Sequence, residues 1–295
     1  MRAIIAAFLV LMASTPEDRP SSSSSAIYKK MMSQESALLG LAPQQRSDLL
    51  QRTYVAAVEE SIFRQKCTGV AVDQLDDVFS ATALMAFYRR DAMWTERVQC
   101  LHAAMVAHDM AEARHHRKLH GLLIAIRRFD QANELRRRFE IEVPQLPPLA
   151  VASGSGISVI SMVGGDRLEQ SVLLPRSEEG IQVIAMVHPF CGFSTRALDS
   201  ILGELRYAWL RPYLQLVVPR EPAWPESAIR AWNIKNPAHP MHAQAMGQAW
   251  QSLGTHETPV FHLLRNGELI VSVTGWKGDG AELDIVRKFL EDLER

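Results

Sequence analysis

The spacing of apolar residues changes near the middle of the chain. Across residues 36–140, glycine and proline are sparse and apolar residues recur every three or four positions, as at Val55, Val58 and Ile62. This period is typical of amphipathic helices, so the first part of the chain predicts an all-helical domain.

Two short segments of this part share an order of residues. Residues 120–139 place Leu123, Ile126 and Phe129 on one face across a tight turn between two helices, and the segment resembles half of a tetratricopeptide-type hairpin. A weaker copy spans residues 86–101. Solenoids need about three or more units to bury their faces, so we expect a helical bundle with some tetratricopeptide-like character.

Residues 143–156 (VPQLPPLAVASGSG) combine three prolines with small residues, a composition that neither continues a helix nor forms a core. A chain of 295 residues is long enough for two domains. We therefore expect a signal peptide with a flexible serine-rich segment at 1–25, a helical domain at 26–142, a linker at 143–156 and a second domain at 157–295.

Beyond the linker the pattern is that of strands alternating with helices. A continuous apolar run at 181–187 predicts a central strand covered on both faces, and Asn266-Gly267 between two apolar runs predicts a hairpin. The expected fold is α + α/β: an all-helical domain, then a domain with a mixed central sheet flanked by helices. The expected strands are 157–163, 168–174, 181–187, 214–218, 260–264 and 269–274, and the expected helices are 194–205, 241–253 and 281–293.

The residues that carry chemistry lie where the central strand ends and a helix begins. There the sequence reads His-Pro-Phe-Cys-Gly-Phe-Ser from His188 to Ser194, and Thr258-Pro259 opens the last hairpin. A cysteine at this junction followed by a distal Thr-Pro hairpin resembles the thioredoxin superfamily over residues 157–295.

The resemblance implies a thioredoxin-like domain with a thiol site. It assigns Cys191 the role of catalytic nucleophile and places Ser194 at the second, resolving position. It also implies a cis Thr258-Pro259 bond that faces Cys191. The residues that it implies for substrate binding are Phe190, Gly192, Phe193, Thr258 and Pro259.

Elementary electrostatics also supports Cys191 as the reactive thiol. The free N–H groups and the positive dipole end at a helix N-terminus stabilise a thiolate and lower its pKa. His188, three residues upstream, either adds positive charge that modulates the thiol pKa or is a solvated histidine at a strand end.

The chain departs from the thioredoxin pattern at two positions. Ser194 cannot form a disulfide with Cys191, so a mixed disulfide on Cys191 needs an external thiol to resolve it. Ala185 stands where the superfamily has a buried acid that assists proton transfer. Cys-Gly-Phe-Ser is also the tetrapeptide of monothiol glutaredoxins, but the loop before Cys191 has no lysine to meet a glutathione carboxylate.

The other two cysteines, Cys67 and Cys100, both fall in the helical part. They are either a structural disulfide, if the protein is exported, or two small buried apolar residues. His116 and His120 are four residues apart on one helix, but no companion carboxylate or cysteine completes a zinc site, so no metal is expected.

Charge and the N-terminal sequence bear on location. A formal net charge of -1 gives no field that attracts nucleic acid. The apolar run at residues 4–13 is too short to span a membrane but suits a signal peptide, so we expect an exported, periplasmic or secreted protein with peripheral or no membrane contact.

These observations lead to a specific functional hypothesis. We expect a monothiol oxidoreductase, isomerase or holdase that acts on disulfides of exported proteins through Cys191, with an external thiol reductant and no cofactor. One alternative is a redox-silent thioredoxin-fold module that binds partners in an envelope assembly. A further alternative is a glutathione or iron-sulfur carrier of the monothiol glutaredoxin type.

Overall fold

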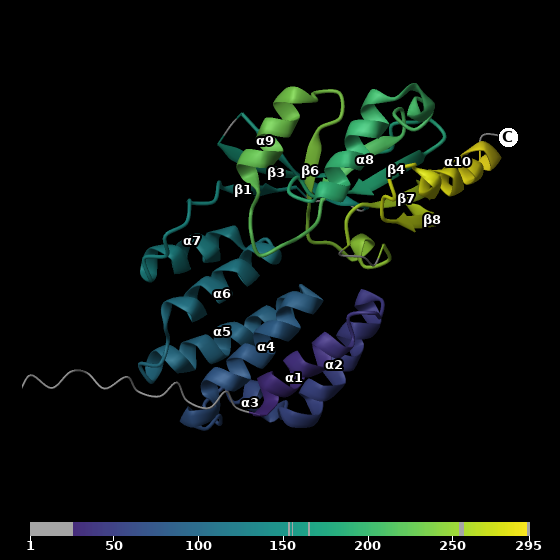
Figure 1. Ribbon diagram of the computed structural model, residues 1–295. Coiled ribbons are helices and arrows are strands. Elements are labelled where there is room, and N and C mark those ends of the chain that lie inside the picture. The colour runs from purple at the N-terminus through teal and green to yellow at the C-terminus, as the bar shows by residue number, and fades with distance from the viewer. Residues whose placement is uncertain (1–25, 153, 155, 165, 254–256, 294–295) are drawn as a thin grey trace, which may run out of the picture.

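The computed structural model describes residues 26–293 except 153, 155, 165 and 254–256. The expected signal peptide and serine-rich segment lie outside the described residues. Figure 1 shows a helical region, residues 26–138, beneath a sheet region, residues 149–293. None of the described helices is both long and apolar enough to span a membrane.

The helical region confirms the all-helical expectation from the three- and four-residue spacing. Helix α6 turns sharply into α7 at residues 126–128, as the stripe across residues 120–139 predicts. The helices are α1 (Ala26–Ala37), α2 (Pro43–Ala57), α3 (Ser61–Arg64), α4 (Leu75–Arg89), α5 (Ala92–Ala107), α6 (Ala113–Ala125) and α7 (Phe129–Arg138), with a short 3-10 turn η1 (Val72–Gln74).

Cys67 and Cys100 form a disulfide that joins the turn after α3 to helix α5. Their Cα atoms are 5.9 Å apart, and the bond closes a loop with a sequence separation of 33 that contains all of α4. The side chain of Cys67 is buried, so the bond lies in the core of the helical region.

The sheet region is built around one mixed sheet in the order β1-β3-β2-β6-β5-β4-β7-β8. Strands β4, β5 and β6 are parallel, whereas the hairpins β2–β3 and β7–β8 are antiparallel and flank them. The strands are β1 (Leu149–Val151), β2 (Ser158–Val163), β3 (Arg167–Val172), β4 (Ile181–Met186), β5 (Leu214–Val218), β6 (Met241–Gln244), β7 (Val260–Arg265) and β8 (Glu268–Thr274).

The central strand is covered on both faces, as its apolar run predicts. All six residues of β4 are buried. Val183 and Ala185 belong to the cluster formed with α8 (Gly192–Gly203), α9 (Glu226–Lys235) and α10 (Ala281–Leu293), whereas Ile184 and Met186 pack on the other face against a cluster that includes Trp250. Two short 3-10 turns, η2 (Leu205–Tyr207) and η3 (Gln248–Trp250), complete the region.

This arrangement is a thioredoxin-like fold. A central strand leads into the cysteine-bearing helix α8, a parallel strand returns beside it, and an antiparallel hairpin and a terminal helix end the chain. The hairpin β2–β3 and the strand β6 widen the sheet on the side of β5. The expected α + α/β class is confirmed.

One expected element is wrong and one helix was not expected. Residues 241–253 form no α-helix, because Met241, Ala243 and Ala245 alternate with polar residues and give β6 a period of two against β5. Helix α9 lies between the expected strand 214–218 and the expected helix 241–253, where the sequence predicted no helix. Strand β1 lies within the segment 143–156 and pairs with β3.

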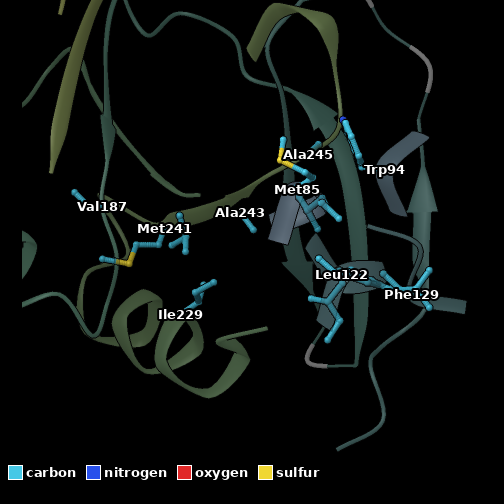
Figure 2. Close-up of a cluster of buried hydrophobic side chains, with 14 of the residues drawn as sticks. Met85, Trp94, Leu122, Phe129, Val187, Ile229, Met241, Ala243 and Ala245 are labelled. Atoms are coloured by element: carbon cyan, nitrogen blue, oxygen red, sulfur yellow. The ribbon is translucent and has the colours of Figure 1, made fainter. Parts of the chain in front are cut away.

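The two regions share one continuous core. Figure 2 shows Met85 and Trp94, Leu122 and Phe129 from the helical region in one cluster with residues of the sheet region, among them Ala243 and Ala245. Helix α6 lies very close to the sheet region at Gly121. A Cβ at this position would be only 2.9 Å from the Cβ of Pro222. The helical region is therefore packed against the sheet region rather than attached only through the segment between them.

A buried histidine makes the stability of this fold depend on pH. Burial lowers the pKa of His262, on β7, to about 4, and its Nδ1 lies 2.7 Å from Ser272 Oγ. In the unfolded chain His262 has its ordinary pKa near 6.5 and is protonated at a higher pH than in the folded chain. The contribution of the neutral ring to stability is therefore complete above pH 6.5 and is lost as the pH falls towards 4. The loss reaches about 3 kcal/mol below pH 4.

The variant His262→Asn keeps a polar partner for Ser272 but does not titrate. We therefore expect its free energy of unfolding to fall less than that of the parent as the pH is lowered. Urea unfolding between pH 8 and pH 4 measures this, with His108→Asn on an exposed position as the matched control. An equal acid sensitivity of the His262 variant and the parent would contradict the assignment.

Candidate active site

The site is built at the carboxyl end of β4. The chain leaves the strand at Met186, turns through a hydrogen bond from the Cys191 N–H to the His188 carbonyl at 3.0 Å, and enters α8 with Cys191 as its N-cap residue. The side chain of Cys191 is half-buried. A thiol that begins a helix and remains accessible has the position that the sequence predicts.

The loop before β7 lies against this cysteine. Cys191 Sγ is 3.5 Å from the Thr258 carbonyl oxygen, and the Thr258-Pro259 bond is cis, as the resemblance implies. Strand pairing explains the proximity, because Met186 at the end of β4 pairs with Val260 at the start of β7. The antiparallel register therefore brings together two segments that are 67 residues apart in the sequence.

The surroundings of the Cys191 sulfur favour its anionic form. Partial burial raises the pKa of the Cys191 thiol, but hydrogen bonds to the sulfur outweigh this and leave the pKa below its ordinary value. They come from the backbone N–H groups of Ser194 and Phe193 and from the side chains of Thr258 and Ser194. The N–H groups are the unsatisfied donors of the first turn of α8.

Ser194 occupies the position of a resolving cysteine but contributes hydrogen bonds instead of a thiol. Its side chain is fully buried, and its Oγ accepts a hydrogen bond from the His188 N–H at 3.2 Å. The same hydroxyl helps to lower the pKa of Cys191. Ser194 therefore connects the loop to the sulfur through hydrogen bonds, but it supplies no thiol.

His188 orients the loop through both of its ring nitrogens. Its Nδ1 accepts from the Phe190 N–H at 3.3 Å, and its Nε2 lies 3.2 Å from the Glu221 carboxylate. The hydrogen bond from His188 is the main cause that lowers the pKa of Glu221. His188 is thus held between Glu221 and the loop backbone.

Apolar surface flanks the thiol. Phe190 is 72% exposed and Phe193 is 55% exposed, which is unusual for phenylalanine, while Gly192 between Cys191 and Phe193 is also exposed. A cavity of about 310 Å³ opens beside the loop between α8 and α9, where Pro189 and Trp232 contribute to its walls. The residues expected to bind substrate are therefore together around Cys191.

The histidines that the sequence singled out do not assemble a metal site. His116 Nδ1 lies 2.8 Å from His102 Nε2, and its ring stacks on Phe139. Across the described residues, no three side chains of histidine, cysteine, aspartate or glutamate are grouped as metal ligands.

Sequence reasoning missed Glu221 and three arginines behind it. Arg90, Arg127 and Arg220 cluster near Glu221, and the positive charges of Arg90 and Arg127 help to lower its pKa. Glu221 and Arg220 follow β5, which is parallel to β4. Their position directly after a strand could have placed them near Cys191, because the carboxyl ends of adjacent parallel strands meet at one edge of a sheet.

Comparisons with known proteins add little to this geometry. No model of a protein family matches the chain, and no curated protein matches it. Among solved structures, a thioredoxin-like protein from Bacteroides caccae matches with 11% identity over 84% of this chain and 95% of that chain, with a TM-score of 0.31. The assignment of a thioredoxin-like fold depends on the strand order and on the position of Cys191.

Proposed function

We propose that the protein exchanges disulfides through the single thiol of Cys191. The observation that carries the proposal is the Cys191 sulfur itself, half-buried at the N-terminus of α8, 3.5 Å from the Thr258 carbonyl and surrounded by donors that lower its pKa. A thiolate stabilised at neutral pH is the nucleophile that attacks disulfides.

The reaction has two steps. The Cys191 thiolate attacks one sulfur of a protein disulfide, a Cys191–substrate disulfide forms, and the other substrate sulfur leaves as a thiolate that takes a proton from water. A thiolate from an external reductant or from the substrate then attacks the mixed disulfide and releases Cys191. Release from within the chain has no thiol available, because Cys67 and Cys100 are bonded to each other.

The surroundings of Cys191 support a protein substrate. The exposed rings of Phe190 and Phe193 offer apolar contacts on either side of the thiol, and the loop at Thr258 and Pro259 offers backbone groups beside it. Such a surface suits an extended segment with apolar residues near its cysteine. Monothiol chemistry on this class of substrate corresponds to an isomerase or a slow oxidoreductase.

We also propose that the protein works in an oxidising compartment outside the cytoplasm. The support is the disulfide between Cys67 and Cys100, since disulfides persist chiefly in secreted and periplasmic proteins. The apolar run at residues 4–13 is consistent with export.

The proposal predicts long-lived mixed disulfides on Cys191. Incubation of the full chain with an oxidised extract of exported proteins, followed by alkylation and non-reducing electrophoresis, should show adducts that a reductant removes. Cys191→Ala should abolish them, because the attacking thiol is absent.

The control variant is the double change Cys67→Ala and Cys100→Ala. It should retain the adducts, because both residues belong to the helical region and neither supplies the attacking thiol. Absence of adducts from the parent, or adducts that survive in Cys191→Ala, would exclude the catalytic proposal. Non-covalent partners retained equally by the parent and by Cys191→Ala would instead favour a redox-silent binding module.

A further inference from the structure

A second cavity, separate from Cys191, lies between the helical and sheet regions. It has a volume of about 680 Å³, within the range of about 300–1,000 Å³ typical of small-molecule sites. The end of α4 and Asp91 form one wall, and Arg220 with the segment from Gln244 to Gln251 forms the other. Sites for small ligands occur preferentially at such junctions.

Positive charge dominates the walls of this cavity. Arg89, Arg90 and Arg220 line it, and Asp91 is the acid among the lining residues. The Asp91 carboxylate is already engaged, because Oδ1 accepts the Trp94 N–H at 2.9 Å and caps α5. The remaining polar lining is uncharged and comes mainly from glutamine side chains.

Arg90 and Arg220 are joined through each other's backbone carbonyls, and the nearby carboxylates are Glu221 beside Arg90 and Asp91 beside Arg220. Arg220 Nη1 donates to the Arg90 carbonyl at 2.6 Å, and Arg90 Nη1 donates to the Arg220 carbonyl. Burial, followed by the charge of Arg90, lowers the pKa of Arg220 to about 10. Arg127, close behind, has its pKa lowered to about 9 by burial and by the same two arginines.

Unused donors accompany this charge. In the part of the chain that the structure describes, the buried Nε groups of Arg220 and Arg89 have no acceptor. Arg89 is paired through Nη2 with Asp48 at 2.7 Å, so its Nε is a separate donor. Burying a cation is costly, and a ligand that brings negative charge and acceptor oxygens to the other guanidinium nitrogens would offset part of that cost.

We propose that this cavity binds a small anionic molecule through a phosphate or carboxylate group, with its oxygens on Arg220 and Arg89 and its remainder against the glutamines. A guanidinium group can form two parallel hydrogen bonds with either a phosphate or a carboxylate, so the same arginines can bind both groups. Because its walls come from both regions, the bound anion would hold the helical region against the sheet region.

The test is calorimetric titration of the full chain with inorganic pyrophosphate in one arm and citrate in the other, at constant ionic strength set with chloride. Saturable binding in either arm is expected, and the stronger arm identifies the phosphate or the carboxylate class. Arg220→Lys, which keeps the charge but loses the planar fork, should weaken binding at least about tenfold.

Arg220 also joins the two regions, so a second variant protects the test from loss of folding. Arg89→Gln leaves the contacts between Arg90 and Arg220 intact and should weaken binding severalfold, whereas Arg137→Gln, an equal loss of charge on the exposed face of α7, should not. No saturable binding in either arm, or equal binding by the Arg89 and Arg137 variants, would overturn the proposal.

Discussion

Replacement of Ser194 by cysteine is expected to convert slow monothiol exchange into rapid disulfide reduction. Ser194 is fully buried in the first turn of α8, and its hydroxyl already hydrogen-bonds the Cys191 sulfur. A thiol at this position can attack the mixed disulfide within the same molecule, and intramolecular attack has a large effective concentration advantage. We expect insulin reduction in dithiothreitol to rise by at least about tenfold over the parent.

Thr195→Cys is the matched control for this experiment. Thr195 is the next residue of α8 but is exposed, and its Oγ1 donates to the Cys191 carbonyl at 3.2 Å instead of contacting the sulfur. The added thiol should therefore leave insulin reduction near the parent rate. A Ser194→Cys rate equal to that of Thr195→Cys would show that the missing thiol does not limit the reaction.

Loss of the bond between Cys67 and Cys100 is expected to destabilise the chain by about 3–4 kcal/mol, from closure of a loop of this length. The loop contains α4, which packs against α5, α1 and α2, so the unfolded chain gains freedom in a central part of the helical region. Urea unfolding of the Cys191→Ala variant, with and without prior reduction, isolates this effect because no other thiol is present.

The double change Cys67→Ala and Cys100→Ala in the same background should reproduce the reduced form. Equal unfolding midpoints for the oxidised and reduced chains would contradict the structural role of the bond. A peptide map of non-reduced protein from an oxidising compartment that shows both thiols free would contradict its formation.

The sequence predicts those elements whose signals are local. Strand β5 and helix α10 have the bounds that their apolar patterns indicate, Leu214–Val218 and Ala281–Leu293. The position of Cys191 is predicted in the same way, because a buried strand, a motif and a helix follow one another directly. The hairpin of β7 and β8 was found from its Asn266-Gly267 turn.

Elements that depend on distant partners were missed. Strand β6 has four residues, and it exists because it pairs with β5 on one side and β2 on the other. The cluster of Arg90, Arg127 and Arg220 draws on residues up to 130 positions apart, so no local pattern marks it. Glu221 takes its role from His188, which lies on another strand end.

The pKa of the Cys191 thiol tests the central claim most directly. With Cys67 and Cys100 bonded, Cys191 is the free thiol of the chain, so the pH dependence of iodoacetamide alkylation reports on it alone. The account predicts a pKa below the ordinary value of about 8.5, raised by Ser194→Ala and unchanged by Thr195→Ala. A pKa at or above about 8.5 in the parent chain would contradict the account.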